Sequence, residues 1–457
     1  MASIQLDTSS DLTELENHHP ELAKTFKSLR DEISSPRLDQ KENWNKSSID
    51  IVASIAHRQA AGEEFDGLID RIRALDGFEN FLLPLSGDEL MELGADGPII
   101  TFNISSLRSD AFLITKNRIH CLHLPTLRFA DLESRCSSFT DLMSRLSTAN
   151  YYSINLAVQR ILEWLWDVAV GPILDELGFT EEPKPGDQWP HVWWIPCGLL
   201  NILPIHAAGY HMHSKQNALD RVISSYSPTI KALAYSRNRT PLSSQISELL
   251  LVSMPDTPNQ TPLPNSRAEV QELRKLFAPS IKTSVLELPR KNDVLSELGS
   301  CHIAHFACHG NSSINNPSES HLLLHDWNVN PLTVADVVAL NLGNTHLVYI
   351  SACHAAVGRV TRLYDEAIHM AGAFQLAGVS QVVGTLWHID DYAAVGISRE
   401  CYQTLLTKSG QIDLKLVAQG LHRAVRRVRQ ENLSGPSSRR RRECNPLIWA
   451  PYIHMGG

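Results

Sequence analysis

Several features typical of other protein classes are missing from this 457-residue chain. No run of about 18 apolar residues occurs, so no membrane-spanning helix is predicted. The N-terminus, MASIQLDTSSDLTELENHHPEL, is polar and acidic without an apolar core, so we do not expect a secretory signal. The eight cysteines are scattered rather than dense, unlike those of small secreted domains. We therefore expect reduced thiols and a cytoplasmic location, with the nucleus as the alternative.

The chain also lacks an excess of basic residues. Lysine and arginine number 41, aspartate and glutamate 50, and the formal net charge is -9. Nucleic acid therefore gains no general electrostatic attraction and is not expected as a partner. No glycine-rich phosphate-binding motif is present, so we expect no nucleotide cofactor. Hydrophobic content of 43% and charged content of 20% are typical of a globular protein.

Three parts are expected along the chain. Residues 1–77 have a helical pattern without a visible repeat period. Residues 78–240 are a mixed α/β unit with a hairpin and a long apolar helix over 151–177. In residues 241–457, apolar strands alternate with helices, which predicts a mostly parallel sheet covered by helices on both faces. The strands expected there are 249–253, 283–288, 302–307, 347–351 and 381–386; the helices are 266–277, 292–298 capped by Asn292, 333–340 capped by Thr333, 366–377 and 414–429.

Two of these strands end in reactive side chains. One leads into Cys308, His309 and Gly310, and the other into Cys353. Active sites of open α/β sheets lie at the carboxyl ends of strands, so His309 and Cys353 meet there if their strands are parallel neighbours. An imidazole can take the proton of a thiol, whose ordinary pKa is about 8.5, and the thiolate then attacks a carbonyl carbon.

Such an attack creates an oxyanion that needs backbone donors. Gly310 has no side chain to cover its N–H, and the N–H of Cys353 is a second donor. The ordinary interpretation stays open beside this one: a lone cysteine after an apolar strand is most often a core residue, and a lone His-Gly pair is most often a turn.

A dense set of potential soft-metal ligands surrounds the histidine: Cys301, His302, His305, Cys308 and His309. The spacing is not that of paired zinc-binding cysteines. Alternation along a strand places His305 and His309 on one side and Cys308 on the other. We therefore expect no metal site and interpret His305 as a core histidine.

Three further features have competing interpretations. Asp365 and Glu366 begin a predicted helix, where carboxylates complement the helix dipole; alternatively they line a substrate pocket that favours a basic residue. His206 has no cysteine partner and is interpreted as structural. The run 439–442 is a solvated basic loop, with a nuclear-localisation patch or a processing site as alternatives.

Longer blocks resemble the CHAT-domain family. In the family's order and spacing, the chain contains HFACHG (305–310), LVYISAC (347–353), DEAIHMAGAFQLAG (365–378), VVGTLW (382–387) and PLIWAPYIH (446–454). PIHAAG (204–209) resembles an upstream block, and the similarity extends from about residue 78 to the end. The stretch 326–333 resembles fungal members, which often carry preceding helical repeats, so the chain is a short member or a piece of a longer protein.

The resemblance implies a caspase-like fold related to that of separases. The catalytic α/β part would follow a pseudo-caspase-like α/β unit and an N-terminal helical segment. It also implies a cysteine peptidase acting on protein substrates through a thioester, with Cys353 as nucleophile, His309 as base, and Gly310 and Cys353 as the oxyanion hole. Caspases likewise place the histidine about 50 residues before the cysteine; here the separation is 353 − 309 = 44.

A second hypothesis is a non-catalytic interaction module with the same fold, and an acyltransferase using the same pair is a distant third. Caspase-like enzymes are commonly latent until a loop reorders. Residues 310–320, rich in Asn and Ser, are the candidate loop. A regulatory protein partner is therefore a further expectation.

Overall fold

The computed structural model describes residues 12, 15, 16, 18–34, 48–146, 150–212, 215–238, 246–278, 280–311, 317–340, 342–355, 370–434 and 444–457. The chain divides into two compact units, Met1–Ser86 and Gly87–Gly457. Within the described ranges, no helix combines the length and the apolar character that crossing a membrane requires.

The smaller unit is helical, as predicted. Helix α2 (Pro20–Ser34) begins at a proline, which is favoured in the first turn of a helix, and α3 (Ser48–Arg73) follows it. Phe26 of α2 packs against the rings of Phe65 and Phe81 at centroid distances of 4.8 and 5.6 Å. The unit therefore has an apolar core of its own.

The larger unit is built on one sheet. Its strands are β1 (Ile99–Ile104), β2 (Ser109–Ile114), β3 (Ile119–His123), β4 (His191–Ile195), β5 (Ile223–Tyr226), β6 (Glu248–Ser253), β7 (Lys282–Glu287), β8 (Ile303–Asn311), β9 (His321–Leu323), β10 (Leu332–Thr333), β11 (Leu347–Ala355), β12 (Gln381–Thr385) and β13 (Tyr452–Gly456). Eleven of them follow the order β10-β9-β8-β11-β12-β13-β5-β4-β1-β2-β3. The other two are β6 and β7: β6 pairs with the first part of β8, β9 pairs with its last part, and β7 pairs with β6.

Parallel pairing dominates the centre of the sheet. Strands β7, β6, β8, β11 and β12 are parallel neighbours, as are β5, β4 and β1. β13 joins the two sets, antiparallel to β12 and parallel to β5. Both expected parts, 78–240 and 241–457, thus contribute strands to one sheet, and the division between them stays a prediction.

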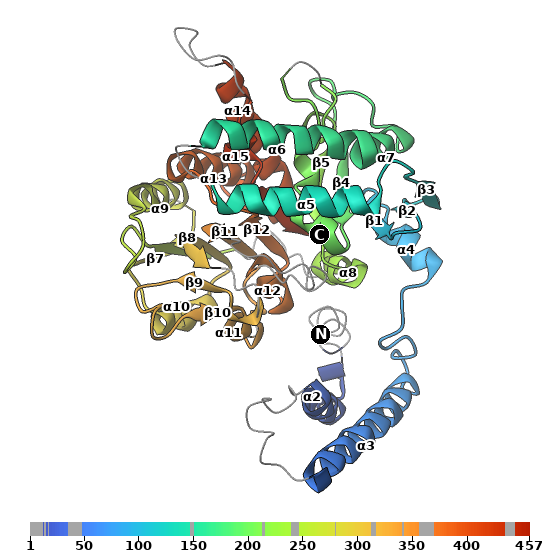
Figure 1. Ribbon diagram of the computed structural model, residues 1–457. Coiled ribbons are helices and arrows are strands. Elements are labelled where there is room, and N and C mark those ends of the chain that lie inside the picture. The colour runs from blue at the N-terminus through green and yellow to red at the C-terminus, as the bar shows by residue number, and fades with distance from the viewer. Residues whose placement is uncertain are drawn as a thin grey trace. The chain divides into compact units, whose positions relative to one another are not determined.

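Helices cover both faces of this sheet, which confirms the predicted architecture. α9 (Pro264–Phe277), α13 (Asp391–Leu405) and α14 (Val417–Ser434) pack together on one face, and α8 (Ile230–Asn238), α10 (Lys291–Leu298), α11 (Val334–Val338) and α12 (Met370–Leu376) lie on the other (Figure 1). The remaining helices are α4 (Gly87–Leu93), α5 (Phe129–Ser144), α6 (Tyr151–Leu165), α7 (Gly171–Glu176) and α15 (Pro446–Trp449). Because both faces are covered, the central strands are almost entirely buried.

Two helix predictions need correction. The cap predicted at Asn292 is wrong: Arg290 is the N-cap of α10, because the Asp293 carboxylate accepts from its backbone N–H at 2.8 Å. The long helix predicted over 151–177 contains a π-helical turn, Trp166–Val170, between α6 and α7. Pro172 in the first turn of α7 has no N–H to donate, which favours such a change in hydrogen bonding. The cap predicted at Thr333 is confirmed.

Close packing of α13 on α14 yields a stability prediction. A Cβ on Gly420 would lie 2.7 Å from the carbonyl oxygen of Cys401, a backbone atom that moves only with α13. We expect Gly420→Ala to lower the free energy of unfolding by about 1–3 kcal/mol, measured by urea denaturation. Gly396→Ala is the matched control, because nothing lies within 4 Å of its Cβ. Alanine's helix propensity should make that change neutral or stabilising by up to about 1 kcal/mol. Equal midpoints for both variants would contradict this packing.

Candidate active site

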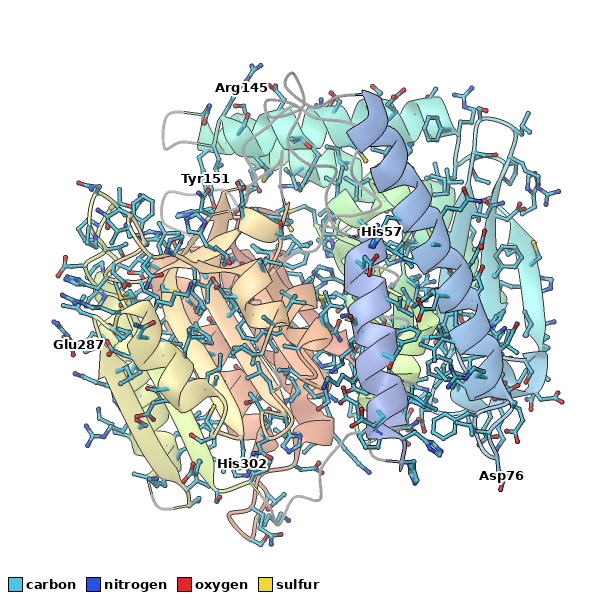
Figure 2. All side chains as sticks on the ribbon, turned by 90° about the horizontal axis from the view of Figure 1, so that it is seen from below. His57, Asp76, Arg145, Tyr151, Glu287 and His302 are labelled. Atoms are coloured by element: carbon cyan, nitrogen blue, oxygen red, sulfur yellow. The ribbon has the colours of Figure 1, made fainter. Side chains whose placement is uncertain are left out.

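The backbone positions of His309, Gly310 and Cys353 lie at one edge of the sheet. The parallel strands β6, β8, β11 and β12 all end at this edge, so the segments that follow them meet there. In Figure 2, Glu287 at the carboxyl end of β7 and His302 just before β8 mark the two opposite edges. The edge at the carboxyl ends is the one where ligands bind in open α/β sheets.

His309 and Cys353 are Cα partners in the register of β8 and β11. Adjacent strands lie about 4.8 Å apart, so these two backbone positions are direct neighbours. The requirement that the two strands be adjacent and parallel, which the sequence analysis left as a condition, is therefore confirmed.

The imidazole of His309 is held by a backbone carbonyl. The ring is only 7% exposed, and its Nε2 lies 2.8 Å from the carbonyl oxygen of Thr261. A carbonyl oxygen only accepts, so Nε2 carries the proton of the neutral ring and Nδ1 is left as the proton acceptor. The fold thus selects the tautomer of the histidine.

The segment that carries Thr261 follows β6 and is anchored at several points. The N–H of Leu263 donates to the carbonyl oxygen of Pro255 at 2.9 Å, and the indole Nε1 of Trp327 donates to that of Pro258 at 2.9 Å. Nothing in the sequence around Thr261 indicated this role, because a carbonyl group is common to every residue.

Gly310 lies between two strands, in register with Leu322 of β9 and His354 of β11. Its part in an oxyanion hole, like that of the N–H of Cys353, stays a prediction. Asp365 and Glu366, the predicted pocket carboxylates, lie outside the described residues, as does residue range 312–316 of the predicted loop.

The sequence analysis missed His388, which follows β12 at the same edge. Its side chain reaches solvent, yet partial burial lowers its pKa; nearby His309 lowers it further, while Asp390 and Asp391 act in the opposite direction. The available signal was its position, three residues beyond the end of β12, which is one of the predicted parallel strands. Asp391 also accepts from the backbone N–H and side-chain amide of Asn265, at 3.0 and 2.8 Å, which ties the start of α13 to that of α9.

His305, which the sequence predicts to be a core histidine, lies on β8 among the residues considered as metal ligands. His305 is fully buried, as predicted, and its Nε2 lies 3.3 Å from a carboxylate oxygen of Glu269. In the part of the chain that the structure describes, no group of three or more His, Cys, Asp or Glu side chains could hold a metal ion.

The other described cysteines differ sharply in accessibility. Cys121 and Cys197 are exposed, and the rest are buried. Burial raises the pKa of Cys136, Cys301 and Cys444 to about 12 in each case. A thiol with so high a pKa is a poor nucleophile at neutral pH, so these residues have structural roles.

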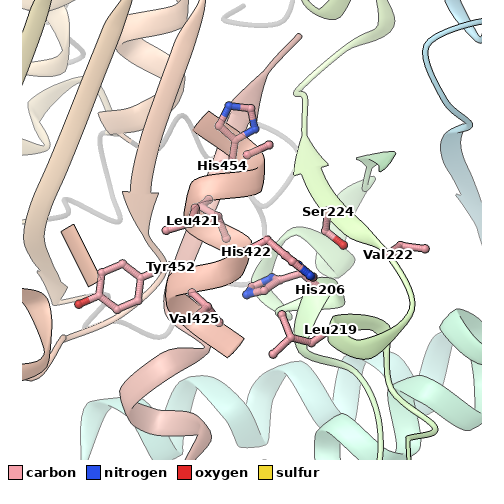
Figure 3. Close-up of a pocket in the computed structure, with 11 residues that line it drawn as sticks. His206, Leu219, Val222, Ser224, Leu421, His422, Val425, Tyr452 and His454 are labelled. Carbon is pink, nitrogen blue, oxygen red and sulfur yellow. The ribbon is translucent and has the colours of Figure 1, made fainter. Parts of the chain in front are cut away.

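A separate pocket contains three buried histidines. His206, His422 of α14 and His454 of β13 line it together with apolar side chains (Figure 3). Burial lowers their pKa values, to about 4 for His206 and about 3 for the other two. The Nδ1 of His206 lies 2.8 Å from the hydroxyl of Tyr226, which agrees with its interpretation as a structural residue.

The family model of the CHAT domain matches residues 159–457. This match spans more than half of the chain, and the chain belongs to the CHAT domain family. No curated protein sequence matches it.

Solved structures resemble the fold. Two crystal structures of the Saccharomyces cerevisiae separase–securin complex match with TM-scores of 0.57 and 0.55 at 11% identity, covering 99% and 90% of this chain. The chain spans 34% of the length of each of those chains. The complex of the Porphyromonas gingivalis RgpB pro- and mature domains matches with a TM-score of 0.36 at 10% identity, over 71% of this chain and 76% of that one. The two separase matches show that this mixed α/β fold, with its mostly parallel sheet, is similar to the caspase-like fold of separase.

The three buried histidines generate a prediction for stability against pH. Their folded pKa values lie below the unfolded value of about 6.5, so their neutral forms stabilise the fold above that pH. This contribution, roughly 3–5 kcal/mol for each histidine, should be lost as the pH falls from about 6.5 to about 4 for His206 and to about 3 for the other two. Urea denaturation at pH 7 and pH 4.5 measures the loss. His422→Phe cannot take up a proton and should show a smaller loss than the unmodified protein, whereas the change of an exposed histidine, His325→Asn, should leave it unaltered. Equal pH dependence in all three proteins would refute this.

Proposed function

We propose that the protein is a cysteine endopeptidase with Cys353 as nucleophile and His309 as general base. The observation that carries the proposal is the register that pairs these two positions on adjacent parallel strands. The hydrogen bond from His309 to the carbonyl of Thr261 supports it, because it leaves Nδ1 free to accept a proton. Membership of the CHAT domain family and the separase-like fold add further support.

The first half of the reaction acylates the enzyme. Nδ1 of His309 takes the proton of the Cys353 thiol, and the thiolate attacks the carbonyl carbon of the scissile peptide. A C–S bond forms, and the carbonyl oxygen becomes an oxyanion that accepts from the N–H groups of Gly310 and Cys353. The imidazolium then returns its proton to the leaving amine as the C–N bond breaks, which leaves a thioester on Cys353.

The second half hydrolyses this thioester. His309 removes a proton from a water molecule, the water oxygen attacks the acyl carbon, and the thiolate leaves with the carboxylic acid product released. Throughout, Nε2 of His309 donates to the carbonyl of Thr261. That bond becomes charge-assisted whenever the ring is an imidazolium, so it favours the thiolate–imidazolium pair.

The proposed peptidase also has an expected substrate class, an expected partner and an expected place in the cell. Substrates are proteins, no cofactor takes part, and Asp365 and Glu366 favour a basic residue beside the scissile bond. The separase of the matched complex was crystallised with securin, a protein partner. By analogy we propose a regulatory protein partner for this chain, action in the cytoplasm or nucleus, and a place among the fungal members of the family.

We expect a panel of peptides carrying a thiol-directed electrophile to label Cys353 faster than the exposed Cys121 and Cys197. The residue labelled is found by mass spectrometry, and the peptide that reacts best reveals the preferred side chain. His309→Ala should slow labelling of Cys353 by about 10²–10⁴-fold, the usual contribution of a general base. Cys353→Ala should abolish hydrolysis of a peptide substrate.

Cys197→Ala is the matched control, because it removes an accessible thiol away from the dyad and should leave hydrolysis unchanged. Circular dichroism checks that each variant is folded. Labelling that follows exposure alone and ignores the His309 substitution would instead favour a caspase-like interaction module without catalysis.

A further inference from the structure

A cluster of buried polar side chains includes one residue from each of the two strands that carry the proposed dyad, and it takes no part in the proposed reaction. Glu269 of α9 is 3% exposed, His305 of β8 is fully buried, and Ser351 of β11 is 5% exposed. Tyr402 of α13 completes the cluster and is 1% exposed. These residues come from two strands and two helices, in a layer whose other side chains are mostly apolar.

Glu269 is the centre of this cluster. One carboxylate oxygen, Oε2, accepts from the hydroxyl of Ser351 at 3.2 Å, and the other, Oε1, lies 3.3 Å from Nε2 of His305. The hydroxyl of Tyr402 lies 3.4 Å from Nδ1 of the same imidazole. The ring of Tyr349 stacks on that imidazole with a centroid distance of 4.9 Å.

The two residues that Glu269 contacts lie on the strands that carry the proposed catalytic positions, nearer to Cys353 than to His309. Ser351 precedes Cys353 by two residues on β11, and His305 precedes His309 by four residues on β8. Glu269 of α9 is therefore hydrogen-bonded to β11 through Ser351 and lies against β8 at His305, where neither Oε1 of Glu269 nor Nε2 of His305 has a hydrogen-bond partner among the described residues. The same helix begins directly after the segment whose Thr261 carbonyl holds the His309 ring, and its Asn265 is bound by Asp391.

A buried carboxylate of this kind is costly to maintain. Burying a carboxyl group costs free energy unless its oxygens are hydrogen-bonded, and Oε1 of Glu269 has no such partner in the part of the chain that the structure describes. An apolar side chain at position 269 would stabilise α9 against the sheet without this penalty. We therefore explain the presence of Glu269, rather than an apolar residue, by a need to hold β8 and β11 in a fixed geometry.

We propose that Glu269 is a positioning residue for the dyad: by bonding Ser351 and contacting His305, it holds the ends of β11 and β8 in the separation that the reaction requires. The inference rests on the proposed function. It assigns Glu269 no contact with substrate or with the reacting atoms. Displacement of a reacting group by about 1 Å can cost on the order of 10² in rate, so a modest shift of either strand would be visible in catalysis.

Three variants test the proposal in the full-length protein. Glu269→Ala removes both contacts, and Glu269→Gln keeps an oxygen that can accept from Ser351. Glu272→Ala, on the same helix with its carboxylate paired to Lys275, is the matched control. The measurements are the rate constant for alkylation of Cys353 by iodoacetamide, and kcat and KM for a peptide substrate once one is known.

We expect Glu269→Ala to lower kcat and the alkylation rate by about 10-fold to 100-fold with KM little changed. Glu269→Gln should stay within about threefold of the unmodified protein, because the contact with Ser351 survives. Unchanged rates in Glu269→Ala, equal losses in the Ala and Gln variants, or a similar loss in Glu272→Ala would each overturn the proposal.

Hydrogen exchange of the backbone amides separates this inference from the proposed function. Glu269→Ala should increase exchange at the carboxyl ends of β8 and β11 whether or not the thiol is reactive, and unaltered exchange there would overturn the positioning role. Absence of selective labelling at Cys353 in the unmodified protein would count against the peptidase instead. If Glu269→Ala does not fold, Ser351→Ala is tested instead. This variant removes the hydrogen bond between Ser351 and Glu269 by deleting only one oxygen. Unchanged hydrogen exchange and an unchanged alkylation rate in Ser351→Ala would overturn the proposal as well.

Discussion

The parallel pairing of β8 with β11 is the constraint on which the rest of the candidate site depends. It brings His309 and Cys353, which are 44 residues apart in the sequence (353 − 309), into register as neighbours. The pairing persists because residues 303–310 of β8 and residues 347–352 of β11 are buried, with helices covering each face of the sheet. A shift of the register by one residue would bring a different residue opposite Cys353.

Backbone groups as well as side chains define the geometry of the candidate site. The carbonyl of Thr261 selects the tautomer of His309, and Thr261 is itself held by a segment anchored through Pro255 and Pro258. Backbone donors and acceptors in a folded segment are already oriented, so they need no reorganisation during a reaction. The geometry of the site therefore depends on the whole edge of the sheet rather than on two residues.

The last strand, β13, links the two sets of parallel strands into one sheet. Around this junction, His206, His422 and His454 are buried and neutral, and hydrogen bonds join His454 to both Ser225 of β5 and Gln381 of β12. The part of the chain from Gly87 to about residue 240 is consequently in the same compact unit as the proposed catalytic part.

The amino-acid sequence by itself determined the alternation of apolar strands and helices, the two strands that end in His309 and Cys353, and the blocks that identify the family. These features are local, since hydrophobic periodicity and short motifs lie within a few consecutive residues. Only the tertiary structure decided which strands are neighbours and in what register, that Thr261 contacts His309, and that Glu269 reaches His305 and Ser351. Such contacts join residues up to 82 positions apart and depend on how helices pack on the sheet, which no short-range pattern encodes.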